Sequence, residues 1–152
     1  KCIINNYYRN IKIFKFAKMN TMQNVFTLKI TVSSEDIDNL RHVNNLVYVK
    51  WMDKIATTHW NFLTKENPLP QYIWVVMRHE IDYLKQAGLG DEIVVKTWVG
   101  ETKGITSIRF MEFYKEDTLL VKAKTTWAML NAKTFKPVRI REDVLSILQP
   151  PK

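Results

Sequence analysis

The sequence predicts an α+β fold in which one long central helix is wrapped by a five-stranded antiparallel sheet. The helix is indicated by the segment from about Asn45 to Leu63, which is apolar on nearly every side, as in a helix buried inside a domain. The sheet is indicated by five segments of strand-like alternation, most of them joined by turns short enough for hairpins. A helix lying across one curved sheet buries both apolar surfaces, so the two observations support each other.

Length and composition point to a single domain in a reducing compartment. The chain has 152 residues, 46% of them hydrophobic, which is sufficient for one core. Its single cysteine, Cys2, excludes an intramolecular disulfide framework and a cysteine-based metal site, so we expect an intracellular, cytoplasmic setting. The helical segment is interrupted by polar side chains too often for a membrane span, at Lys50, Asp53, Lys54 and His59.

The basic charge is concentrated at the N-terminus. Residues 1–24 contain five basic residues and no acid, which leaves +3 of the formal net charge of +8 for the remainder. We interpret residues 1–24 as an N-terminal extension, either a leader or disordered arm or a short amphipathic arm, and residues 25–152 as a single domain. A basic tail can touch nucleic acid or a membrane surface, but we favour a solvated extension. The domain lacks the aromatic and basic pattern of RNA-binding sheets, so no nucleic-acid partner is expected.

Along the sequence, one predicted strand precedes the helix and four follow it. Residues 25–32 alternate apolar and polar side chains and lead into a polar loop. After the helix and the turn-rich residues 64–70, residues 72–84 predict a long strand with six residues on one face: Ile73, Val75, Met77, His79, Ile81 and Tyr83. Three further strands are expected at about 92–102, 105–115 and 118–131, and a short closing helix at 142–148.

A cluster of polar residues lies between the first strand and the helix. The carboxylates of Asp36 and Asp38 are followed by His42 and by Asn44 and Asn45, where the helix is expected to begin. Taken singly, the aspartates and asparagines are most simply caps, and the histidine is a structural hydrogen-bonding group. Taken together ahead of a buried helix, they favour a catalytic site. A carboxylate can act as base or nucleophile there, while the unpaired N–H groups of the helix start polarise a carbonyl.

This pattern resembles the opening motif of the hotdog-fold acyl thioesterases. Two branches are similar: the 4-hydroxybenzoyl-CoA thioesterase-like acyl-CoA hydrolases, and the thioesterases that act on acyl carrier protein (acyl-ACP). The resemblance covers residues 25–148 and includes the turn at Gly90 and Asp91 before the third strand. It rests on the run Asp36-x-Asp38-x-x-x-His42-Val43-Asn44-Asn45-x-x-Tyr48-x-x-Trp51.

The resemblance implies an acyl thioesterase that works as a homodimer or homotetramer, with sites at the subunit boundary. It implies that Asp38 is the catalytic carboxylate and that the backbone N–H of Asn45 polarises the thioester carbonyl. In the acyl-ACP branch, His42 acts beside Asp38. Two departures are present. Leu40 stands where the acyl-ACP branch has Asn, and Arg41 stands where the hydroxybenzoyl branch usually has Gly.

The remaining candidate residues surround this motif. Asn44, Tyr48 and Arg41 are the candidate substrate-binding residues, and Asp53 is at a position where related thioesterases often carry an acid. A structural role is the simpler interpretation for Asp53. The substrate is expected to be acyl-CoA or acyl-ACP. For CoA phosphates, the candidate basic residues are Arg41, Lys85, Lys133, Lys136, Arg139 and Arg141.

Several other chemistries are excluded or left as alternatives. His59 and His79 lack metal-ligand spacing, no G-x-S-x-G elbow is present, and no phosphate-cradling glycine loop occurs, so neither metal nor cofactor is expected. A hotdog hydratase or dehydratase is one alternative, although its D-x-N-P-x-H motif is absent. A non-catalytic acyl-thioester-binding protein is another, and retention of Asp38 with His42 argues against it.

Overall fold

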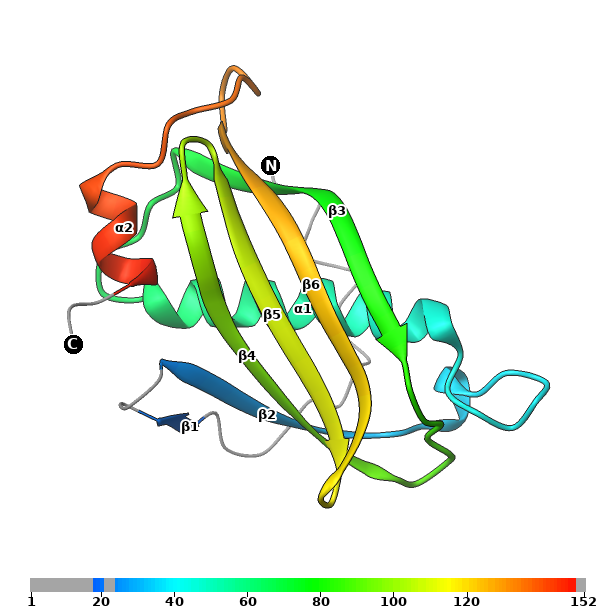
Figure 1. The fold of residues 1–152 in the computed structure, drawn as a ribbon. Helices are drawn as coiled ribbons and strands as arrows, with labels where there is room; N and C mark the ends of the chain where they lie inside the picture. Colours follow the sequence, from blue (N-terminus) through cyan, green and yellow to red (C-terminus); the bar gives the residue numbers. More distant parts are fainter. Residues whose placement is uncertain (1–17, 21–23, 150–152) are drawn as a thin grey trace.

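A curved antiparallel sheet wraps around one long helix in the computed structural model, which describes residues 18–20 and 24–149 (Figure 1). In this part of the chain the strand order is β1-β2-β4-β5-β6-β3, and every neighbouring pair is antiparallel. The helices are α1 (Asn45–Leu63) and α2 (Glu142–Leu148), and a 3-10 turn covers Ser34–Asp36. The strands are β1 (Lys18–Asn20), β2 (Val25–Thr31), β3 (Tyr72–Tyr83), β4 (Glu92–Lys103), β5 (Thr106–Lys115) and β6 (Thr118–Asn131). The predicted α+β class, the central helix and the five predicted strands are confirmed.

Helix α1 lies across the concave face of the sheet and supplies the centre of the core (Figure 1). Trp51 and Ile55 are fully buried. The sequence predicted burial on nearly every side, but the structure buries one face and leaves Leu46 and Phe62 exposed. The buried face consists of Val47, Tyr48, Trp51, Met52, Ile55, Ala56 and His59.

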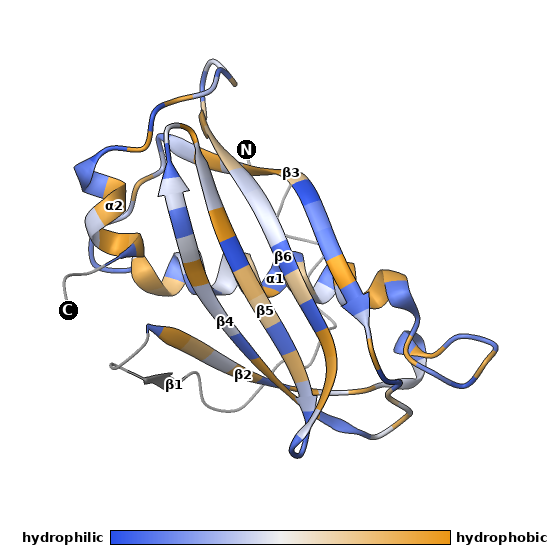
Figure 2. Cartoon of the chain, viewed as in Figure 1, coloured by the Kyte–Doolittle hydropathy of each residue, from blue (hydrophilic) through white to orange (hydrophobic). Residues whose placement is uncertain are grey.

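The inner face of the sheet completes the core. Strands β4, β5 and β6 alternate buried and more exposed residues, so each turns one apolar face towards α1. The alternation is visible as hydrophobic and hydrophilic bands along the strands (Figure 2). A second, smaller cluster joins β6 to α2 and the chain before it, through Met129, Ile140, Val144 and Leu148.

A bulge in β3 corrects the predicted strand face. Trp74 is opposite Met129 on β6, and His79 is opposite Thr125, so both lie on the inner face. They are an odd number of residues apart because the register shifts between Val76 and Arg78. The prediction that Ile73, Val75 and Met77 share a face with His79, Ile81 and Tyr83 is therefore wrong for the first three.

Part of the predicted extension belongs to the sheet. Residues 18–20 form β1 and pair with β2, with Lys18 opposite Thr27 and Asn20 opposite Val25. The sequence assigned these residues to the extension and did not predict this short sixth strand. The predictions of a leader, a disordered arm or an amphipathic arm otherwise fall on residues 1–17 and 21–23, which lie outside the described residues.

Candidate active site

The motif forms a tight loop that leads into α1. Ile37 and Val43 pair as an isolated antiparallel bridge, and the N–H of Asp38 donates to the carbonyl of His42 at 2.9 Å. At the tip of the loop Arg41 has a φ of 63°, and its side chain is exposed. The backbone pairing brings Asp38 and His42 side by side just before the helix start.

The carboxylate of Asp38 uses one of its two oxygens to hold this loop. Oδ1 accepts the N–H of Leu40 at 2.9 Å and that of His42 at 3.4 Å. Among the described residues, no donor reaches Oδ2, and the side chain is half-buried. The capping interpretation therefore accounts for Oδ1, and Oδ2 is left for chemistry.

The start of α1 leaves one N–H group unpaired. Asn44 is the N-cap, and its Oδ1 accepts the N–H of Leu46 at 2.9 Å, while its carbonyl accepts the N–H of Val47 at 2.9 Å. The N–H of Asn45 has no acceptor in the described part of the chain. The carbonyl of Asn45 accepts the hydroxyl of Tyr83 at 3.1 Å, which ties the first turn to β3. An unpaired N–H at a helix start is the donor that an oxyanion hole requires.

Asp36 and His42, two other titratable residues of the motif, differ in their partners. Asp36 Oδ2 accepts both the N–H and the hydroxyl of Ser33 at 2.8 Å, so this carboxylate closes the preceding 3-10 turn. His42 is half-buried, and its Nδ1 is buried with no partner among the described residues. An unpartnered buried ring nitrogen in an otherwise paired loop is consistent with a catalytic contact.

Tyr48 lies in the core rather than on an open surface. It is 2% exposed, and its ring packs edge-on against Trp51, Tyr83 and Phe113. Burial raises the pKa of its phenol to about 12, with further contributions from Tyr83 and Asp91, so the group stays protonated at neutral pH. A direct substrate contact from Tyr48 would require this aromatic cluster to open.

We expect Asn44→Ala to lower the free energy of unfolding by about 0.5–2 kcal/mol, because it removes the oxygen that caps the N–H of Leu46. Asn44→Asp is the matched control, since it keeps a capping oxygen. Urea denaturation of the three proteins measures the difference. Equal stability of the Ala variant and the wild type would contradict the assigned capping role.

A cavity of about 420 Å³ opens at the other half of α1. Its wall includes Asp53, which the sequence singled out as an acid of structural or secondary function. The cavity is formed by α1, the start of β3, the inner faces of β5 and β6, and the end of α2. The lining residues are Asp53, Ala56, Thr57, Trp60, Asn61, Tyr72, Ile73, Trp74, Ser107, Arg109, Trp127 and Leu148.

A buried network under this cavity was not predicted from the sequence. The guanidinium of Arg109, 7% exposed, donates through Nη1 to His59 Nδ1 at 2.8 Å and to the hydroxyl of Thr97 at 3.1 Å. Burial and the charge of Arg109 lower the pKa of His59 to about 3, so this imidazole is neutral and accepts through Nδ1. The sequence feature that could have revealed this network is the charged side chain of Arg109, which alternates with Ser107 and Met111 on the inner face of β5.

The neutral imidazole predicts a specific acid sensitivity. The pKa of His59 falls from 6.5 to about 3 on folding, so the unfolded chain binds the extra proton between these values and stability falls as pH falls below 6.5. Lowering the pH from 7 to 5 should therefore reduce the free energy of unfolding by about 2 kcal/mol through His59 alone. His59→Asn places an oxygen acceptor where Nδ1 lies and cannot titrate. Urea denaturation at both pH values should show a smaller loss for this variant, and an equal loss would refute the assignment.

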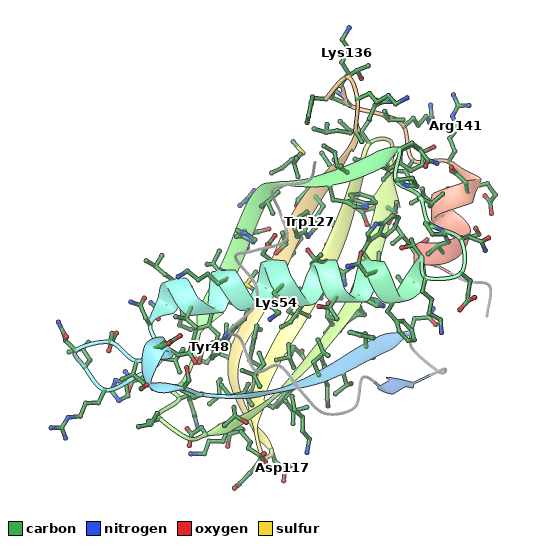
Figure 3. The ribbon with its side chains drawn as sticks, turned by 180° about the vertical axis from the view of Figure 1, so that it is seen from behind. Tyr48, Lys54, Asp117, Trp127, Lys136 and Arg141 are labelled. Carbon is green, nitrogen blue, oxygen red and sulfur yellow. The ribbon has the colours of Figure 1, made fainter. Side chains whose placement is uncertain are left out.

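The candidate basic residues for CoA phosphates do not form one cluster. Lys136 and Arg141 lie together at the end of the molecule where β6 leads to α2, whereas Tyr48 marks the opposite, N-terminal end of α1 (Figure 3). Arg41 belongs to the loop at the Tyr48 end. Within residues 18–20 and 24–149, no group of His, Cys, Asp and Glu side chains could hold a metal ion. None of the helices described is long and apolar enough to cross a bilayer.

The fold and the motif loop together define the class of protein. One long helix across a single curved antiparallel sheet, entered through a carboxylate-bearing loop, is the hotdog fold. The profile of the thioesterase-like superfamily matches residues 32–148, and the chain therefore belongs to this family.

Individual relatives agree with this assignment. The chain is 28% identical over 127 residues to the acyl-CoA thioesterase YbgC of Haemophilus influenzae, covering 81% of this chain and 93% of that protein. It is 31% identical over 80 residues, 51% of this chain, to a chloroplastic acyl-[acyl-carrier-protein] hydrolase of Cuphea viscosissima, but spans only 19% of its length. A predicted thioesterase from Bacillus stearothermophilus shares the fold with a TM-score of 0.74 at 22% identity, over 82% of this chain and 93% of that one.

Proposed function

We propose that the protein hydrolyses acyl-CoA thioesters to the free acid and the thiol. The observation that carries this proposal is that one short loop holds both a carboxylate oxygen of Asp38 and a backbone N–H of Asn45 that have no partner among the described residues. Thioester hydrolysis needs these two elements: a group that activates water or attacks the carbonyl, and a donor for the oxyanion that forms.

The reaction proceeds through a tetrahedral intermediate. Asp38 takes a proton from a water molecule that adds to the thioester carbonyl, and the N–H of Asn45 stabilises the resulting oxyanion. The C–S bond then breaks, and the thiolate leaves with the proton. Alternatively, Asp38 attacks the carbonyl itself, the C–S bond breaks, and the thiolate leaves. Water then hydrolyses the mixed anhydride, which restores the Asp38 carboxylate, releases the acid and supplies the proton that the thiolate takes up. His42 orients Asp38 or relays its proton in either case.

CoA is the first-choice carrier, and ACP is the second. The relative named as an acyl-CoA thioesterase aligns over nearly its whole length, which supports CoA. The acyl-ACP hydrolase is the relative with the higher identity over a shorter segment, and the His42-Val43-Asn44-Asn45 run resembles that branch. The same acyl group presented on CoA and on ACP separates the two in a thiol-release assay. A higher kcat/KM for CoA supports the proposal, and release only from ACP would reassign the carrier.

The active form is proposed to be a dimer built through β3. This strand is one edge of the described sheet, with its other side paired to β6. It exposes three consecutive apolar residues, Val75 and Val76 at 38% each and Met77 at 60%. An exposed apolar strand edge is a template for pairing with another strand. A second copy of β3, running antiparallel, would cover it and extend the sheet.

Such pairing would complete the site. A two-fold axis through the paired β3 strands sets the two α1 helices antiparallel on the same face of the joined sheet. Each helix start, with Asp38 and Asn45, then approaches the half of the partner helix that carries the cavity. The acyl group would enter one subunit while the other supplies the carboxylate. Size-exclusion chromatography with light scattering tests the assembly, and a monomer at full activity would contradict it.

A further inference from the structure

Two hydrogen-bond donors in the wall of the cavity have no acceptor. The indole N–H groups of Trp74 and Trp127 are buried and unpaired among the described residues, and both tryptophans line the cavity. Nearly all buried polar groups in proteins are hydrogen-bonded, and an orphaned donor carries a substantial desolvation cost. Two such donors around one cavity make it a candidate site for a ligand that carries a hydrogen-bond acceptor.

The same wall holds a buried cation without an acidic partner. Arg109 is 7% exposed, and its two hydrogen bonds both go through Nη1 to neutral groups, the imidazole of His59 and the hydroxyl of Thr97. No ion pair joins Arg109 to an acid in the described part of the chain. Buried charges are normally paired, so an anionic group of a ligand would supply the partner that the guanidinium of Arg109 lacks.

The strand register gathers these donors on one face. Arg109 on β5 is opposite Thr125 on β6, and Trp127 lies two residues further along β6 on the same inner face. Trp74 is opposite Met129, the next inner residue of β6. Figure 3 shows Trp127 between the sheet and α1. The donors therefore come from three adjacent strands.

We propose that this cavity binds a carboxylate carried on a small, flat apolar body. The carboxylate accepts from Arg109 and the indole N–H groups, and the rings of Trp60, Trp74 and Trp127 contact the apolar body. A volume of about 420 Å³ is in the range of small-molecule sites. Asp53 is the one acid among the described residues of the wall, so repulsion between like charges directs the ligand carboxylate away from Asp53 and towards Arg109.

The carboxylate can come from two sources. It is either a free carboxylic acid or the distal carboxylate of an acyl group, and the second source rests on the proposed thioesterase function. Binding of a free acid requires no hydrolysis. The proposal on the cavity can therefore succeed or fail independently of the reaction.

The first test is isothermal titration calorimetry with phenylacetate and its neutral analogue phenylacetamide. Wild type should bind the acid about tenfold to a hundredfold more tightly than the amide, as expected for a charge-assisted contact. Arg109→Gln should abolish the preference. Trp74→Phe and Trp127→Phe, which keep an aromatic ring and remove the N–H, should each weaken acid binding about twofold to tenfold. Arg78→Gln is the control, because Arg78 is exposed on β3 and paired with Glu80.

The outcomes decide the proposal. Equal binding of acid and amide to wild type, or no binding of either, would overturn it. So would unchanged acid binding in both Trp→Phe variants, which also covers the case in which Arg109→Gln fails to fold.

The second test separates the two sources. Hydrolysis of para-carboxyphenylacetyl-CoA is compared with that of para-methylphenylacetyl-CoA. A wild-type preference for the carboxylated thioester that Arg109→Gln abolishes assigns the distal carboxylate of the acyl group. Acid binding in calorimetry without that preference assigns a free acid. Acid binding with no hydrolysis of these two thioesters, nor of any other acyl-CoA or acyl-ACP, would refute the proposed function and leave the cavity proposal standing.

Discussion

Asp38→Asn is expected to reduce thioester hydrolysis by at least about 10³-fold while leaving the fold intact. The variant keeps an oxygen that can accept the N–H groups of Leu40 and His42, so the loop before α1 should hold its shape. It loses the negative charge that activates water or attacks the carbonyl. Steady-state thiol release and the far-UV circular dichroism spectrum measure the two effects.

The same substitution at Asp36 is the matched control. Asp36 lies in the same loop, but its carboxylate closes the 3-10 turn through Ser33, and an asparagine oxygen can do the same. Asp36→Asn should therefore retain activity within a few-fold. Wild-type turnover in the purified Asp38→Asn protein would eliminate the mechanism proposed here.

The double substitution Val75→Lys and Met77→Lys should convert the protein to a monomer and lower activity by about 10²-fold or more. In a two-fold antiparallel pair of β3 strands centred on this exposed stretch, each introduced lysine faces an introduced lysine of the partner strand, and like charges directly opposite each other destabilise a strand pair. A monomer lacks the partner groups at the site, and small displacements of reacting groups already cost about 10² in rate. Light scattering gives the mass, and thiol release gives the activity.

The control for this double variant is Phe135→Lys. Phe135 is 68% exposed in the connection after β6 and is not on the β3 edge. This variant should keep both assembly and turnover. A double-lysine variant that stays dimeric, or a monomer that keeps full turnover, would contradict the proposed interface.

The order of elements was predictable because local patterns determine it. The helix α1 begins and ends where apolar periodicity, Asn44 and the turn after Leu63 indicate. Strand β6 alternates as expected only in its middle, because Leu120 and Ala128, predicted on the solvent face, are buried. The candidate site was predictable as a linear motif, since Asp38, His42 and Asn45 lie within eight residues of one another. Whether Asp38 and Asn45 act as proposed is a question for the variants above.

Features that depend on a partner strand were not predictable. The bulge near Met77 fits β3 to β6, and no local residue preference indicates it. Residues 18–20 form a strand only because β2 offers an edge. Arg109 and His59 are 50 residues apart in sequence, and only the crossing of α1 over β5 brings them together. The orphaned N–H groups of Trp74 and Trp127 likewise require knowledge of what surrounds each ring.

Thiol release from a panel of acyl-CoA thioesters, from short to long aliphatic chains and including aromatic acyl groups, tests the central claim most directly. The proposed function predicts that thiol is released catalytically from one part of the panel, at a rate proportional to the concentration of the wild-type enzyme. The Asp38→Asn variant should show no such release. No release above the uncatalysed rate from any acyl-CoA, followed by none from the matching acyl-ACPs, would show that the free carboxylate oxygen beside the helix start does not hydrolyse thioesters.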